Sequence, residues 1–144
     1  MKDNIVFKKI WQDNDLKEIE AVCSSPIIEA VSKIYVSDEL IDELTFQIRN
    51  FLNGKIEEGL WANEIRGNMT SACLSLRFIK KDKRGHICIE VFAELDDGGN
   101  YDKHNCCFFV NTEHGLLMRF GERLARLKDC PVGYEIRLIN PETA

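Results

Sequence analysis

An alternation of apolar and other side chains in residues 72–79 and 87–95 constrains the fold of this chain more than any other feature. A two-residue period of this kind indicates β-strands, and the polar turn at 81–85 predicts that the two segments form a hairpin. Folding the chain about this turn pairs positions whose numbers sum to about 167, so Arg77 faces Glu90 across the strands. Because apolar side chains then also face one another, the sequence predicts the register of this hairpin as well as its existence.

A third strand, a helix and a last strand are predicted after the hairpin. Residues 104–111 alternate again, beyond a polar loop at 96–103. The residues that follow repeat apolar side chains at helical spacing, which predicts a helix whose cap is Asn111 or Thr112. Residues 134–139 have the alternation of a final strand.

The first half of the chain contains one well-marked helix. Ser37 is a favourable N-cap residue, the segment after it carries an apolar stripe, and Asn53 and Gly54 form a typical helix stop. The patterns ahead of this helix are less regular and predict two or three strands. These strands are expected within 5–11, 17–23 and 27–36, and a short further strand is expected around Leu60 and Trp61.

The order of these elements predicts a single α+β domain over residues 1–144. Strands, helix, strands, helix and strand, joined by short links, suit a mainly antiparallel sheet of about six to seven strands with both helices packed on one face. The chain of 144 residues has the size of one domain, and its 44% hydrophobic and 30% charged residues are ordinary globular usage. Disordered and fibrous proteins are excluded by this composition.

Charge and hydropathy restrict the partners and the compartment. The net charge of −5 argues against affinity for nucleic acid or for an anionic membrane. No apolar run approaches the roughly 20 residues of a membrane span, and the N-terminal residues lack the pattern of a secretory signal, so a cytoplasmic protein is expected. Because four of the six cysteines lie in apolar strand-like segments, we expect all six to be free thiols.

Two His-x-Cys motifs are the strongest candidate metal ligands. Two histidines and two thiolates can bind zinc, and the motifs supply His86 with Cys88 and His104 with Cys106. The predicted hairpins, however, separate the two motifs by about eight residues along the strands, or roughly 26 Å. The loop at 96–102 gathers oxygen ligands but lacks the closing glutamate of a calcium loop. We therefore expect no metal and no cofactor.

A carboxylate and a histidine are predicted to face each other next to the loop. Positions that sum to about 198 pair Glu94 with His104, and Glu90 lies on the same face of the strand. Such a pair can perform acid–base catalysis, but it is also a common structural hydrogen bond, and no nucleophile converges on it. One interpretation of the chain is therefore a small-molecule-binding or enzymatic domain with a pocket around Glu90, Glu94 and His104.

Four acidic side chains form an outward face on the first helix. We call Asp38, Glu39, Asp42 and Glu43 the helix acids. Such a face is usually solvated surface, but it can also attract a basic partner. A second copy of the chain is a further candidate partner, through an exposed strand edge.

Parts of the chain resemble known proteins. Segments 74–78, 85–91 and 103–110, with Gly115-Leu116-Leu117 after them, resemble a family of small uncharacterised bacterial α+β proteins to which no chemistry is attached. The size, acidity and α+β pattern also resemble immunity proteins of bacterial polymorphic toxin systems. This second resemblance implies a binding protein rather than an enzyme. Such a protein would occlude a basic toxin domain through the helix acids.

Overall fold

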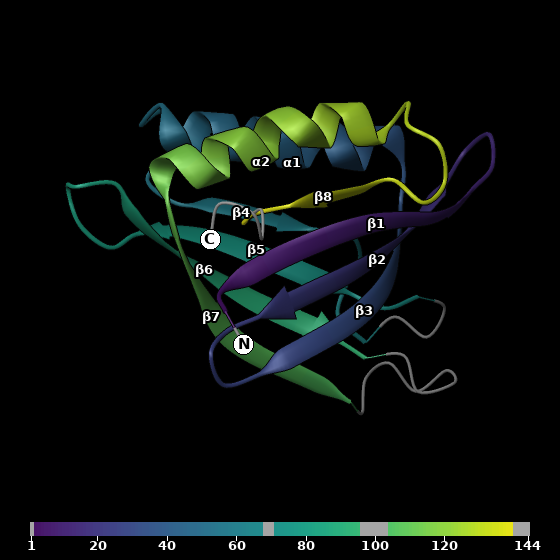
Figure 1. Ribbon diagram of the computed structural model, residues 1–144, viewed down its shortest axis with the longest axis horizontal. Coiled ribbons are helices and arrows are strands. Elements are labelled where there is room, and N and C mark those ends of the chain that lie inside the picture. The colour runs from purple at the N-terminus through teal and green to yellow at the C-terminus, as the bar shows by residue number, and fades with distance from the viewer. Residues whose placement is uncertain (1, 68–70, 96–103, 140–144) are drawn as a thin grey trace.

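The computed structural model describes residues 2–67, 71–95 and 104–139, which form two antiparallel four-stranded sheets and two helices (Figure 1). The predicted α+β class is confirmed, whereas the prediction of one sheet with six to seven strands is wrong. Alternation shows which side chains share a face of a strand, but it does not show which sheet the strand joins. The elements are β1 (Asn4–Gln12), β2 (Lys17–Ser24), β3 (Glu29–Val36), α1 (Asp38–Leu52), β4 (Gly59–Ala62), β5 (Leu74–Lys80), β6 (His86–Glu94), β7 (Asn105–Glu113), α2 (His114–Leu127) and β8 (Glu135–Arg137).

The two sheets face each other across a shared hydrophobic core. Their strand orders are β3-β2-β1-β8 and β4-β5-β6-β7. Buried side chains from both sheets, such as Phe7 of β1 and Phe78 of β5, belong to the same cluster. Figure 1 shows β1, β2 and β3 crossing in front of β5, β6 and β7. This packing removes the apolar face of each sheet from water, which is the dominant favourable term in folding.

Both helices lie together on one side of the molecule (Figure 1). They pack against each other, α1 also contacts β4 and α2 also contacts β8, so the helix pair connects an edge of one sheet to an edge of the other. The apolar stripes predicted from the sequence are the buried faces of both helices. Neither helix in the described part of the chain has the length and apolar character needed to cross a membrane.

The registers of the second sheet test the predicted hairpins directly. Arg77 faces Glu90 in the β5–β6 pair, as predicted. The β6–β7 pair is shifted by one residue from the prediction, because Glu94 faces Asn105 instead of His104. His86 faces Glu113 at the far end of β7, so the two His-x-Cys motifs lie far apart, as predicted. The candidate calcium loop at 96–102 lies outside the described residues.

The first helix begins and ends where the sequence predicts. The Ser37 Oγ accepts a hydrogen bond from the N–H of Leu40 at 3.2 Å, which satisfies one of the free donors of the first turn. Gly54 has a φ of 76°, a conformation that glycine adopts without steric cost. Asp38 in the first turn and Arg49 in the last turn have the charges that the helix dipole favours.

The second helix begins later than predicted. β7 continues to pair with β6 as far as Glu113, so α2 starts at His114 and the predicted cap at Asn111 or Thr112 is wrong. The N–H of Asn111 donates instead to the Asp3 carboxylate at 3.0 Å. The Glu113 side chain makes no capping hydrogen bond. The strand pairing therefore determines this boundary. The last strand is also shorter than predicted, since β8 covers Glu135–Arg137 only.

Close packing of the helices depends on Gly121 of α2. A Cβ atom at this position would lie 3.1 Å from Cγ2 of Ile48 on α1. We expect Gly121→Val to lower the free energy of unfolding by about 1–3 kcal/mol, because the added methyl groups would push the helices apart. Gly115→Val is the matched control, since a Cβ atom there would meet only the end of Arg119 at 3.9 Å. Urea titration followed by circular dichroism measures both variants, and equal stabilities would contradict this packing.

Candidate functional site

A groove of about 470 Å³ between α1 and β4 contains three of the four helix acids. Its wall on the helix side consists of Glu39, Asp42, Glu43, Phe46 and Gln47, and its wall on the strand side consists of Leu60, Trp61 and Ala62. We call this cavity the α1–β4 groove. It combines carboxylates with large apolar side chains.

The apolar part of the α1–β4 groove is open to solvent. Phe46 is 58% exposed and Leu60 is 61% exposed. α1 buries its opposite side, including Leu44 and Ile48, against the core. The face that carries Glu43 and Phe46 lies outside this buried side and beside β4, at the surface of the molecule. The sequence analysis identified the acids but not Phe46 and Leu60. Phe46 lies outside the apolar stripe of the helix and Leu60 lies next to a turn, and both positions could have indicated that these side chains are exposed.

Hydrogen bonds that β4 donates to α1 hold the strand in place along the groove. The indole N–H of Trp61 donates to the carbonyl of Leu40 at 2.9 Å. The Gln47 side-chain oxygen accepts from the N–H of Leu60 at 3.0 Å. Gly59 lets β4 approach β5 closely, because a Cβ atom there would lie 2.8 Å from the Phe78 ring. The groove is thus formed by packed elements rather than by a loop.

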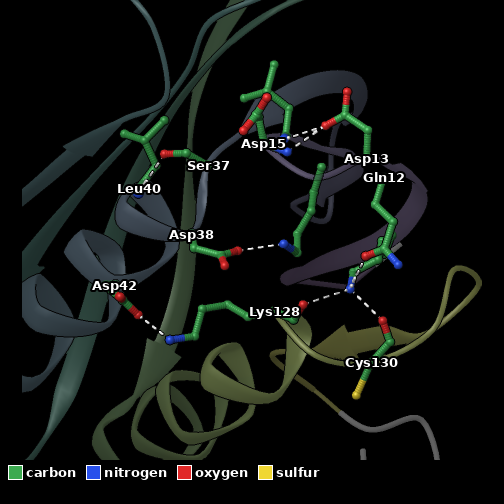
Figure 2. A network of polar contacts seen from close by, with 12 residues as sticks. Gln12, Asp13, Asp15, Ser37, Asp38, Leu40, Asp42, Lys128 and Cys130 are labelled. Atoms are coloured by element: carbon green, nitrogen blue, oxygen red, sulfur yellow. Dashed lines mark hydrogen bonds and ion pairs between the residues drawn. The ribbon is translucent and has the colours of Figure 1, made fainter.

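The helix acids differ in their partners. Asp38 forms an ion pair with Lys17 at 2.5 Å, and Asp42 forms one with Lys128 at 2.7 Å (Figure 2). The hydrogen bond to Asp42 raises the pKa of Lys128. Glu39 and Glu43 make no ion pair within the described ranges, so both carboxylates are available to a partner at the groove. Because the two carboxylates are four residues apart, they lie on one face of α1.

A buried lysine beside this region was not predicted. Lys9 is 0% exposed, and its ammonium group donates to the carbonyl of Cys130 at 2.5 Å, to the Gln12 side chain at 3.1 Å and to the carbonyl of Lys128 at 3.3 Å (Figure 2). Burial is the main cause that lowers the pKa of Lys9, and the charge of Lys17 adds to it. All three donors of the ammonium group are occupied, which indicates a structural role.

Lys9 stabilises the C-terminal end of α2. The carbonyls after the last helical turn carry partial negative charge, and the Lys9 ammonium group lies against two of them. Backbone hydrogen bonds join Lys9 to the residues that follow Cys130, since Lys9 N donates to Tyr134 O and Gly133 N donates to Lys9 O. Lys9 lies two residues after Phe7 and four after Ile5, so its side chain points to the same buried face of β1. The alternation in the sequence could therefore have predicted its burial.

The three residues predicted to line a polar pocket lie in different surroundings. Glu90 is on the outer face of β6, where its carboxylate lies 3.3 Å from Arg77. Glu94 follows four residues later on the same extended strand, roughly 13 Å away. The carbonyl of His104 accepts from the N–H of Leu95 at 2.7 Å. The structure therefore does not bring Glu90 together with Glu94, and the strand register does not place His104 opposite Glu94.

Glu94 is buried and bonded to backbone groups. It is 1% exposed, and its carboxylate accepts hydrogen bonds from the N–H of Cys73 at 2.8 Å and from the N–H of Gly67 at 2.9 Å. The hydroxyl of Ser32 donates to the Glu94 carbonyl at 2.8 Å and thereby links β3 to β6. The Glu94 side chain thus links Gly67 and Cys73, which lie between β4 and β5, to β6.

The cysteines are free thiols with different accessibility. Burial raises the pKa of Cys23 to about 12 and is the main cause that raises the pKa of Cys73 to about 11. Because the thiolate is the reactive form, we expect Cys107, which is exposed, to react with iodoacetamide at pH 8 long before Cys23 or Cys73. Peptide mass mapping over time measures the rates. Equal rates for Cys23 and Cys107 in the folded protein would contradict this expectation.

Comparison of the chain with protein-family models, with curated proteins and with solved structures gives no match.

Proposed function

We propose that this chain is a protein-binding module that takes a basic segment of another protein into the α1–β4 groove. The observation that carries the proposal is the exposure of Phe46 and Leu60 beside two carboxylates, Glu39 and Glu43, that have no ion-pair partner in the described part of the chain. Exposed apolar side chains grouped in a groove are typical of interaction sites.

The two kinds of side chain would contribute differently to binding. An apolar side chain of the partner would cover Phe46 and Leu60, and its burial would supply most of the affinity. Glu39 and Glu43 would accelerate association with a basic surface and would exclude acidic partners. The net charge of −5 acts in the same direction. Binding of this type should weaken as the salt concentration rises.

In its narrower form, the proposal makes the partner a toxin domain. The chain would then inhibit the toxin by covering its functional surface, as the resemblance to immunity proteins implies. Co-expression tests this form: if a neighbouring gene encodes a large secreted protein, the chain should restore growth to cells that produce the C-terminal domain of that protein. Loss of protection with Glu39→Lys/Glu43→Lys would support the groove as the contact. Full protection by that variant would argue for another surface.

The general form is tested by affinity capture from an extract of the cells that produce the chain. We expect the wild-type chain to retain a basic protein at low salt and to release it at high salt. Phe46→Ser and Glu39→Lys/Glu43→Lys should lose it. Asp15→Lys/Glu122→Lys is the matched control, because it changes the net charge equally at exposed positions outside the groove. A protein retained equally by the groove variants, or no retained protein at low salt, would overturn the proposal.

A further inference from the structure

β3 is an eight-residue strand at the edge of its sheet. Its outer face exposes Glu29, Val31, Lys33 and Tyr35 in alternation with buried residues. Val31 is 45% exposed, which is high for a valine in a strand. An edge of this length offers backbone donors and acceptors to another strand.

The backbone groups on the free side of β3 can be identified from two hydrogen bonds. The carbonyl of Tyr35 accepts from the Asn63 side chain at 3.4 Å, so it points away from β2. At the other end of β3, the N–H of Ser25 donates to the carbonyl of Ile28 at 2.8 Å, so the backbone groups of Ile28 point toward β2. The direction of these groups alternates from one residue to the next along an antiparallel strand. The N–H and C=O groups of Glu29, Val31 and Lys33 therefore point to the free edge. Within the described ranges they have no hydrogen-bond partner.

The other sheet edges are less suited to pairing. β4 has four residues and β8 has three, and the N–H of Leu60 on β4 is already bonded to Gln47. β7 is longer, but Asn111 near its end is bonded to Asp3. Its exposed side chains include one charged residue, Glu113, so the strand cannot pair opposite charges with a copy of itself.

We propose that a second copy of this chain pairs with β3 in antiparallel orientation, with Val31 opposite Val31 of the other copy. This register places Glu29 opposite Lys33 on both sides of the two-fold axis. It also lets the free groups of these three residues form about six backbone hydrogen bonds across the axis. The contact is isologous, so it closes as a dimer and does not extend further.

Charge selects this register among the symmetric alternatives. Shifting the strands one way would place Glu29 opposite Glu29, and shifting them the other way would place Lys33 opposite Lys33. Like charges directly opposite each other on one face are destabilising. Smaller shifts, by two residues in either direction, place Glu29 opposite Val31 or opposite Tyr35, so the ion pairs between Glu29 and Lys33 are lost. Only the register centred on Val31 joins acidic to basic side chains.

The rows of side chains across the sheet also continue through this contact. Val6, Val22 and Val31 lie side by side on β1, β2 and β3, and the second copy would add its own three valines to this row. The neighbouring row alternates in charge, as Glu135, Lys8, Glu20 and Lys33. Glu29 of the second copy would be the next member and would continue the alternation. None of these residues lines the α1–β4 groove, so the proposal is independent of the proposed function.

Sedimentation velocity over a wide concentration series tests the dimer. The wild-type chain should pass from monomer to dimer as its concentration rises. Lys33→Glu and Glu29→Lys should each weaken the dimer by about tenfold or more, because each creates two like-charge pairs. The double variant Glu29→Lys/Lys33→Glu should restore it. Lys55→Glu, an exposed charge reversal outside the strands, is the control and should leave the dimer unchanged.

Several outcomes would overturn the proposal. A wild-type chain that stays monomeric at every concentration would mean that Lys33 protects the edge from pairing. A dimer that survives Lys33→Glu would use another surface.

Disulfide trapping tests the same contact if circular dichroism shows that the double variant does not fold. This experiment uses a Cys107→Ser background, which removes the exposed thiol. Val31→Cys should then form an interchain disulfide, since the paired Cα atoms would be about 5.5 Å apart. Val6→Cys should not, and equal trapping at both positions would count against the contact.

Discussion

Replacing Glu94 with glutamine is expected to lower the free energy of unfolding by about 2–4 kcal/mol. The carboxylate is 1% exposed and accepts from two backbone N–H groups, those of Gly67 and Cys73. Glutamine keeps one of the two acceptor oxygens and places its amide N–H₂ against the other donor, which then has no partner. A buried donor without a partner costs the full loss of its hydration.

Glu90→Gln is the matched control for this experiment. Glu90 lies on the same strand, but its side chain is partly exposed and forms an ion pair with Arg77, which is also partly exposed. Surface ion pairs contribute about 0–1 kcal/mol, so the control should change stability little. Urea titration followed by tryptophan fluorescence and by circular dichroism measures both variants. Similar losses in the two variants would mean that the hydrogen bonds of Glu94 to Gly67 and Cys73 do not stabilise the fold.

Replacing Lys9 with methionine is expected to cost about 2–3 kcal/mol. Methionine fills nearly the volume of the aliphatic part of lysine, so the loss isolates the ammonium group and its contacts with the carbonyls of Cys130 and Lys128. Lys9→Ala should cost about 2 kcal/mol more, because it also leaves a cavity. Lys8→Met on the outer face of β1 is the control. If Lys9→Met were as stable as the wild-type chain, the ammonium group would not stabilise the end of α2.

The same lysine gives a pH dependence with a defined sign. Burial lowers the pKa of Lys9 from its ordinary value of 10.5. Between its pKa in the folded protein and 10.5, the unfolded chain therefore binds more protons, so stability rises with pH in this window. The advantage of the wild-type chain over Lys9→Met should grow as the pH approaches 10.5 from below. Denaturant titrations of both proteins at neutral and alkaline pH measure this difference, and a shrinking advantage would contradict the direction of the shift.

Local patterns were sufficient to predict most of the strands and the first helix. The β5–β6 register followed from the sequence because a short turn joins the strands and one shift alone pairs Arg77 with Glu90. The start of α1 followed from the capping chemistry of Ser37. The β6–β7 register was predicted one residue wrong, because the loop at 96–103 is longer and the alternation alone tolerates such a shift.

The features that the sequence did not reveal depend on contacts between distant segments. The division into two sheets is decided by which strands pair at long range, as when β1 pairs with β8. By strand parity, Glu94 belongs to the outer face of β6, like Glu90, but its carboxylate is buried where it accepts from Gly67 and Cys73, which lie far from it in sequence. Phe46 lies in a groove with Leu60 because α1 and β4 pack side by side. No local pattern contains this information.

The pairing of β1 with β8 also determines how the chain can fold. Phe7 near the start of the chain lies opposite Ile136 near its end, so this part of the sheet forms only after residue 136 has been synthesised. Until then the edge of β1 that pairs with β8 remains unpaired. Because contacts between distant residues must overcome the entropy of closing a long loop, they form slowly. The emerging chain is therefore exposed to misassociation for most of its synthesis, and a chaperone that covers β1 during that time would favour correct folding.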